Sequence, residues 1–282
     1  MPAVIDVWNT GTFDSDLKKL LEANGRLIRA YFDTDNAIFL SYDLGRGHPR
    51  PTIRPDNQHA SGFYSLLEEA GQLMAQRTIR AFHYTRLTDD EVADLSISGV
   101  HLSTPETLER RFNALVASSI LSDAIADSLY AQSPFHSDQH DARTGKFWMT
   151  SHPTNPEDSG VAPLMKHWGG EVAWMWVNDP ELLTPLQQIG TPRIIEIAIP
   201  LAATLHSYSA AKAVVAAFGR SLGAIPDKGT FDLYANQALP PSAVLAIHAD
   251  RDPAFAAMGR TYPSGFVDVD LGRWKELTGE ED

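Results

Sequence analysis

Residues 80–104 contain the side chains whose types and spacing are best suited to chemistry. The segment begins Arg-Ala-Phe-His-Tyr-Thr-Arg-Leu-Thr-Asp-Asp-Glu and ends Gly-Val-His-Leu-Ser-Thr. Because successive side chains of a β-strand alternate, His83 and Thr85 lie on one face of the strand expected over 81–86. An imidazole and a hydroxyl placed in this way form a surface that holds a polar ligand through hydrogen bonds. Arg86 stands beside them and adds a cation.

The residues that follow this strand predict a helix that begins at a polar corner. Thr88 and Glu91 have the spacing of a capping box, and Gly99 is suited to end the helix. A second helix is expected from Pro105, with Ser103 or Thr104 as its cap. The strand with the polar face therefore leads into two helices.

Short runs of strand-forming residues elsewhere are expected to build a sheet around this strand. They are separated by capped helices, a pattern typical of α+β proteins. We therefore expect an α+β fold with a central mixed, split or bent sheet and flanking helices. The expected strands are residues 81–86, 146–150, 171–177, 193–199 and 244–248.

The first 78 residues are expected to form a small α/β subdomain or an elaboration of the main domain, which takes residues 79–282. Leucines at helical spacing and clusters of Pro and Gly define the elements of this segment. These elements are strands over 4–8 and 37–42, a helix from residue 12 or 14 to 27, a loop over 45–59 and a helix over 61–74.

The motifs and the order of elements over residues 80–200 resemble those of the ADP-ribosyltransferase superfamily. His83-Tyr84-Thr85 is similar to the His-Gly-Thr or His-Gly-Ser of its diphtheria-toxin-like and poly-ADP-ribosyl branch, and Thr150-Ser151 is similar to the Ser-Thr-Ser of its arginine-first branch. Tyr84 departs from the family pattern, in which glycine lets the backbone approach nicotinamide closely. The resemblance implies a split mixed or antiparallel sheet with flanking helices, and NAD as the substrate.

The resemblance also implies which residues hold and cleave NAD. Breaking the bond between ribose and nicotinamide builds positive charge on the ribose, so the site needs a grip on the ribose, an aromatic surface and a carboxylate. The implied catalytic residues are Glu171 and His83, with Glu196 as the rival carboxylate. The implied cofactor-binding residues are His83, Tyr84, Thr85, Arg86, Ser103, Trp148, Ser151 and Trp168, with Trp174 and Trp176 as further stacking candidates.

The implied function is ADP-ribosyl transfer from NAD, or NAD hydrolysis, in a toxin or defence effector. The acceptor stays open between a protein, a nucleic acid, a small molecule and water, and an antitoxin or immunity protein is the partner such an effector would have. A non-catalytic α+β binding or immunity protein is a second interpretation. A third is a metal-dependent hydrolase, because His136 and His140 stand four residues apart near Asp138 and Asp141.

The composition and the net charge exclude several classes of function. The chain of 282 residues has a formal net charge of -13, which argues against a bulk attraction to nucleic acid or to anionic membranes. It has no cysteine, so disulfides, Cys-based zinc sites and thiol nucleophiles are excluded. No run approaches the roughly 18 apolar residues of a membrane span, and the start carries no secretory pattern. We therefore expect a cytoplasmic protein without a membrane segment.

Overall fold

The chain folds into two compact units. The computed structural model describes residues 3–46, 52–226, 229–260 and 275–280. Unit 1 consists of Met1–Ile79, Pro200–Phe231 and Pro263–Asp282, and unit 2 consists of Arg80–Ile199 and Asp232–Tyr262. No motif or composition change in the sequence indicates that residues 200–231 belong to the first unit. Within the described ranges, no helix combines the length and the apolar character that crossing a membrane requires.

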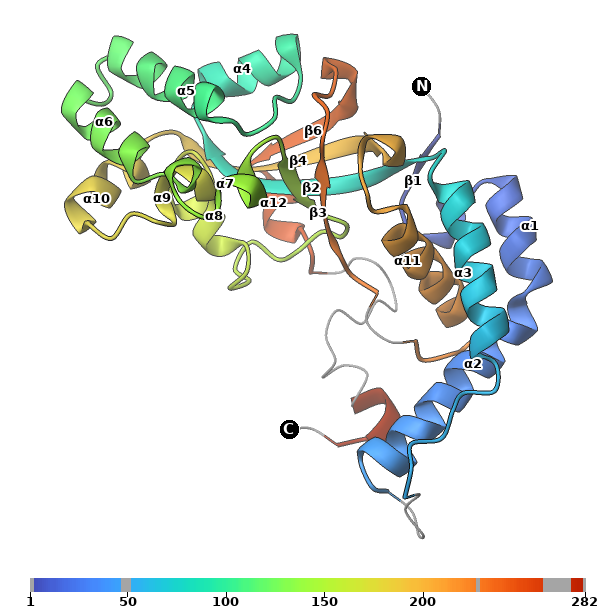
Figure 1. The fold of residues 1–282 in the computed structure, drawn as a ribbon. Helices are drawn as coiled ribbons and strands as arrows, with labels where there is room; N and C mark the ends of the chain where they lie inside the picture. Colours follow the sequence, from blue (N-terminus) through green and yellow to red (C-terminus); the bar gives the residue numbers. More distant parts are fainter. Residues whose placement is uncertain (1–2, 47–51, 227–228, 261–274, 281–282) are drawn as a thin grey trace. The chain divides into compact units, whose positions relative to one another are not determined.

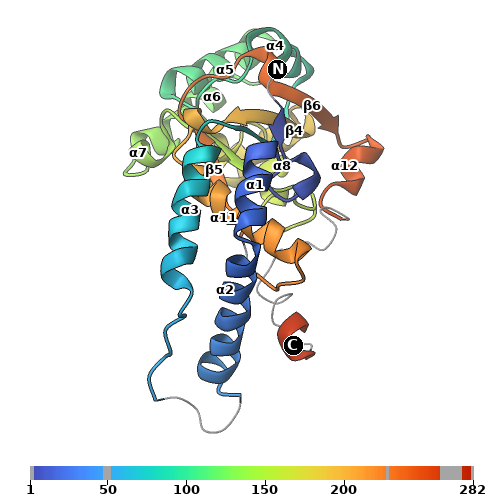
Figure 2. The same ribbon diagram turned by 90° about the vertical axis from the view of Figure 1, so that its right-hand side faces the viewer.

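Unit 1 is mainly helical. Helix α11 packs against α2 and α3, and Figures 1 and 2 both show these helices side by side. Small side chains on α11 allow this close packing, since Ala210, Ala211 and Ala213 are fully buried. The elements are β1 (Val4–Ile5), η1 (Thr10–Thr12), α1 (Ser15–Ala23), α2 (Gly25–Ile38), η2 (Phe39–Asp43), α3 (Ala60–Met74), η4 (Leu201–Ala203) and α11 (Ser207–Ser221).

Five strands of a six-stranded mixed sheet form the framework of unit 2. Its strands are β2 (Thr78–Leu87), β3 (Phe147–Thr150), β4 (Thr191–Pro200), β5 (Asp232–Ala235) and β6 (Val244–Ala249), in the order β5-β3-β2-β4-β6. The pairs β2–β3, β3–β5 and β4–β6 are antiparallel, and β1 pairs in parallel with the first two residues of β2. The expected α+β class with a mixed sheet and flanking helices is therefore confirmed.

The helices of unit 2 begin where polar side chains bond the free N–H groups of their first turns. Thr88 and Glu91 form the expected capping box at α4, and Thr104 and Thr107 form a second one at α5. The elements are α4 (Asp89–Ser98), α5 (Pro105–Ala117), α6 (Asp123–Ala131), η3 (Pro134–His136), α7 (His140–Arg143), α8 (Ala162–Lys166), α9 (Glu171–Trp174), α10 (Pro180–Gln188), η5 (Pro241–Ala243) and α12 (Pro253–Ala257). Figure 1 shows α4, α5 and α6 along one side of β2 and β4.

Two apolar clusters lie within unit 2, and one of them holds the site-bearing strand. Phe82 and Tyr84 of β2 pack with Val161 and Met165 of the α8 segment and with Phe255 of α12. The second cluster joins helices α5, α6, α9 and α10; it includes Leu108, Phe112, Leu115, Leu129, Trp168, Ala173 and Leu186. The two sides of β2 therefore have different surroundings.

Three of the expected strands are wrong or much shorter than expected. Residues 171–177 begin with helix α9, because Gly169 and Gly170 turn the chain at positive φ and Ala173 packs into the helical cluster. Residues 37–42 lie in the end of α2 and in the π-helical turn η2, and β1 covers only Val4–Ile5. The expected helix up to residue 27 is two helices that meet at Asn24, and part of the expected loop 45–59, residues 47–51, lies outside the described residues.

Candidate functional site

The central histidine of β2 is held in one orientation. The Nδ1 atom of His83 lies 2.8 Å from the carbonyl oxygen of Trp148 on β3, and the Phe147 ring lies 4.3 Å from the imidazole. Burial lowers the pKa of His83 to about 4. The hydrogen bond to Trp148 acts to raise the pKa, and the positive charge of Arg111 lowers it further. His83 is therefore neutral at pH 7. Because a carbonyl only accepts, Nδ1 carries the proton and Nε2 is left as an acceptor.

Nε2 is the ring nitrogen of His83 that is left to accept a hydrogen bond. Among the residues the structure describes, it has no hydrogen-bond partner. The side chain is half-buried, and Thr85 on the same side of β2 is fully buried. A partly dehydrated acceptor of this kind binds a hydroxyl group of a ligand more strongly than an exposed one does.

A partly buried ion pair lies near this histidine. Arg111 of α5 donates from Nε to Oε1 of Glu91 at 2.7 Å and from Nη1 to the carbonyl of Gly169 at 3.3 Å. Its guanidinium lies 4.5 Å from the centre of the Trp168 ring. The Nη2 atom of Arg111 is buried and has no partner among the described residues. This nitrogen is a donor available for an oxygen of a bound molecule.

Glu91 is fully occupied by its neighbours. Oε2 accepts from the backbone N–H of Thr88 at 2.9 Å and from Nε1 of Trp168 at 2.8 Å. Burial raises the pKa of Glu91, but the charge of Arg111 and the bonds from Thr88 and Trp168 outweigh burial and lower the pKa overall. The carboxylate therefore positions Arg111 and is not free for a ligand.

Several of the sequence-predicted residues are structural. Trp168 is 0% exposed and packs 5.4 Å from Phe112, so it cannot offer a ring to nicotinamide. The hydroxyl of Tyr84 donates to the carbonyl of Thr154 at 3.0 Å and accepts from its N–H at 2.6 Å, and burial raises the pKa of Tyr84. Ser151 is also buried. These side chains support the sheet rather than line a ligand site.

Other predicted residues contribute their backbone or lie elsewhere. Ser103 bonds Lys146 and Gly145 through its backbone, which ties the entry of α5 to β3. Trp148 supplies the carbonyl that orients His83, and its ring packs against Tyr234. Arg86 lies on the opposite side of β2 from His83, as strand alternation requires. The expected pocket shared by His83 and Arg86 is therefore wrong.

The two candidate carboxylates have different surroundings. Glu171 is the first residue of α9, is half-buried, and pairs with Arg143 at 2.5 Å. Glu196 on β4 is 8% exposed and accepts from Arg80 at 2.6 Å and from Nε2 of His248 at 2.8 Å. Both oxygens of Glu196 are thus engaged. Glu171 is two residues beyond the Gly169 carbonyl that Arg111 contacts, which brings its segment to the Arg111 side of the site.

The described residues contain no group of three or more His, Asp or Glu side chains that could hold a metal ion. In the segment considered for a metal, His140 contacts its neighbour Asp141 at 3.1 Å, and His136 packs at right angles to Tyr130. The hydrolase interpretation therefore has no ligand set in this part of the chain.

Sequence reasoning missed Arg111 and Phe147. Arg111 stands between Leu108 and Leu115 on the buried side of α5, and a cation at helical spacing within an apolar face is a signal for a buried partner. Phe147 is adjacent to Trp148 in a strand that was recognised, but nothing in the sequence showed that its ring meets His83. The site that results combines an oriented acceptor, an available guanidinium N–H and an aromatic ring.

Comparison with known proteins gave no match to a family model, to a curated protein or to a solved structure.

Proposed function

We propose that this protein cleaves NAD at the bond between nicotinamide and ribose, and transfers ADP-ribose to an acceptor or to water. The observation that carries the proposal is the orientation of His83, whose Nδ1 is committed to the Trp148 carbonyl and whose Nε2 is an acceptor. A ribose hydroxyl has the donor that this nitrogen needs. Phe147 lies against the imidazole and supplies an apolar surface for a flat ring.

The reaction requires little acid–base chemistry at the leaving group. The bond from the ribose carbon to the ring nitrogen breaks, and nicotinamide leaves with the electron pair as a neutral molecule. An acceptor hydroxyl, amine or water forms the new bond at that carbon and loses its proton. The site must therefore hold the ribose and stabilise its developing positive charge.

We assign the stabilising carboxylate to Glu171. Its rival, Glu196, is buried and uses both oxygens for Arg80 and His248. Glu171 is half-buried, so it can reach a ligand, and its Oε2 pairs with Nη1 of Arg143. Its segment leaves the Trp168–Gly169 turn that touches Arg111. These contacts favour Glu171 within the same site as His83.

Release of nicotinamide from NAD is the direct test. Glu171→Gln keeps the shape and removes the charge, so turnover is expected to fall about 10²–10³-fold. His83→Ala removes the hydroxyl acceptor and is expected to lower turnover about 10²-fold. His101→Ala, which changes an exposed histidine, is the matched control, and circular dichroism checks that each variant is folded.

Two outcomes would count against this assignment. Normal turnover by Glu171→Gln together with loss in Glu196→Gln would move the carboxylate to Glu196. No nicotinamide release by the parent protein, with water or with protein, nucleic-acid and small-molecule acceptors, would contradict the enzymatic proposal and leave the α+β binding protein as the better description.

A further inference from the structure

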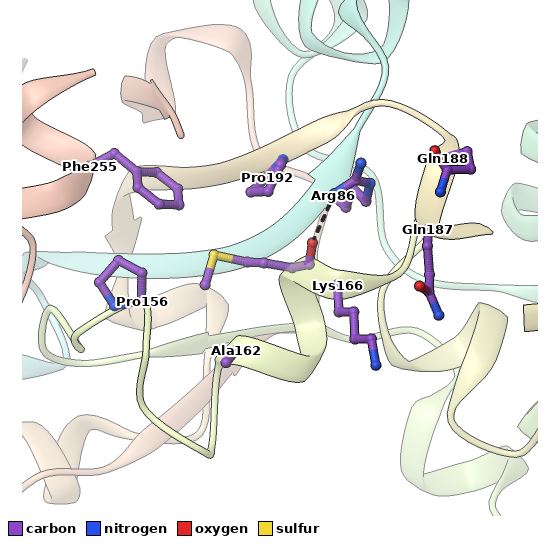
Figure 3. Close-up of a pocket in the computed structure, with 9 residues that line it drawn as sticks. Arg86, Pro156, Ala162, Lys166, Gln187, Gln188, Pro192 and Phe255 are labelled. Carbon is purple, nitrogen blue, oxygen red and sulfur yellow. Dashed lines mark hydrogen bonds between the residues drawn. The ribbon is translucent and has the colours of Figure 1, made fainter. Parts of the chain in front are cut away.

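A pocket lies on the side of β2 that faces away from His83. Its volume is 430 Å³, and it lies entirely within unit 2. Figure 3 shows Phe255 and Pro156 toward one end and Arg86, Lys166 and Gln187 toward the other. The lining residues are Arg86, Pro156, Ala162, Met165, Lys166, Gln187, Gln188, Pro192 and Phe255. One end is therefore apolar, and the other is polar and cationic.

Arg86 carries a charge that the described residues do not neutralise by contact. Its Nε donates to the carbonyl of Ile189 at 2.8 Å, and its Nη1 lies 3.5 Å from the carbonyl of Met165. None of the ion pairs among the described residues involves Arg86. Burial lowers the pKa of Arg86, and the charge of Asp250 opposes this change. A guanidinium that is held by two carbonyls keeps further N–H groups for a planar oxyanion.

The other polar groups of the pocket suit the same ligand group. Lys166 is exposed and brings a second positive charge, and Gln187 and Gln188 bring amide donors. None of the lining residues is acidic. The chain as a whole has a net charge of -13, whereas this end of the pocket is positively charged. The pocket end is therefore expected to attract an anion.

The apolar end determines what the anion is attached to. Phe255, Met165 and Pro192 line the apolar part of the pocket, and methionine is a flexible side chain that can fit partners of different shape. We infer that this pocket binds a small amphipathic anion: a carboxylate or a phosphate monoester on Arg86 and Lys166, with a one-ring apolar body on Phe255 and Met165. The pocket is separate from the NAD site proposed on the His83 side.

Four small probes test the chemistry. 3-Phenylpropionate and phenyl phosphate carry the two oxyanions, 3-phenylpropanamide is the neutral equivalent, and propionate lacks the ring. Titration of the full chain is followed through the NMR signals of the Arg86 Nε–H group and the Lys166 and Gln188 amides. We expect at least one ring-bearing anion to bind with a Kd on the order of 1 mM, and the amide and propionate to bind at least 10-fold more weakly. The better of the two anions identifies the oxyanion that the pocket prefers.

Variants locate the binding. Arg86→Gln is expected to weaken the anion at least 10-fold, and Lys166→Gln about 3-fold, with Arg26→Gln in unit 1 as the matched control. If Arg86→Gln does not fold, the inference is tested by Lys166→Gln and by the neutral amide probe. Lys166 is exposed, so its substitution is expected to leave the fold intact. Three results would each overturn the inference. The first is equal binding of the amide and the anions, and the second is unchanged binding in folded Arg86→Gln or in Lys166→Gln. The third is the absence of a saturable shift with either anion. The measurement involves no turnover, so it is independent of the proposed activity.

Discussion

The Arg111 guanidinium donates to the Glu91 carboxylate at 2.7 Å, and this bond joins helix α5 to the corner where β2 becomes α4. Glu91 thus has two roles, since it caps α4 and also holds the cation beside His83. The sequence predicts Glu91 only as part of a helix cap, but in the structure this residue also positions a side chain of the candidate site. The first prediction concerns this pair.

Glu91→Gln is expected to lower the free energy of unfolding by about 2 kcal/mol at pH 7, because it leaves the partly buried Arg111 charge without its carboxylate partner. Denaturant unfolding measures this loss, and Glu109→Gln on the exposed side of α5 is the control. The folded pKa of Glu91 is lowered, so its contribution is present above the unfolded pKa and is lost as the pH falls. A destabilisation that does not shrink in acid would contradict the ion-pair explanation.

The protonation of His83 predicts a pH dependence of stability. Its imidazole takes up a proton near pH 6.5 when the chain is unfolded, but near pH 4 in the folded protein. The unfolded state therefore gains the proton first as the pH falls, and stability decreases by about 3 kcal/mol between these values. The free energy of unfolding of the parent protein should therefore approach that of His83→Gln as the pH falls through this range. A constant difference from pH 7 to pH 4 would show that His83 is not buried as a neutral group.

Tyr84→Phe tests the structural role of a buried hydroxyl on β2. The substitution leaves both the N–H and the carbonyl of Thr154 without their partner, so we expect a loss of about 2–3 kcal/mol in unfolding free energy. Tyr64→Phe, which alters an exposed tyrosine of α3, is the control. Equal stabilities of the two variants would mean that the Tyr84 hydroxyl does not hold the Thr154 segment.

Gly190 lies between α10 and β4. Adding a single methyl group at this position is expected to destabilise the fold strongly. Its φ is +64°, and a Cβ there would lie 2.2 Å from the carbonyl oxygen of Leu87 at the end of β2. Gly190→Ala is expected to cost about 3 kcal/mol or more through strain and overlap. Gly145→Ala, also at positive φ but with nothing within 4 Å, should cost only about 1 kcal/mol. Thermal unfolding of both variants compares the two; similar costs would show that the close approach to β2 is unimportant.

Local signals in the sequence were enough for the elements that depend on neighbouring residues. The Thr88–Glu91 capping box forms as expected, because its hydrogen bonds lie within four residues. Strand β2 forms around His83, as the strand-forming residues of this segment predict. The α+β class also followed from the alternation of short strands and capped helices.

Tertiary structure decided the elements whose partners are distant in sequence. The aromatic run 171–177 has strand propensity, but it begins as a helix because Ala173 packs against residues of α5, α6 and α10. Trp168 became a buried support and Arg111 a site residue because both meet Glu91, 77 and 20 residues away. Such contacts depend on how helices pack against the sheet. Sequence therefore determined the residues on the strand face, and packing decided which of them remain available to a ligand.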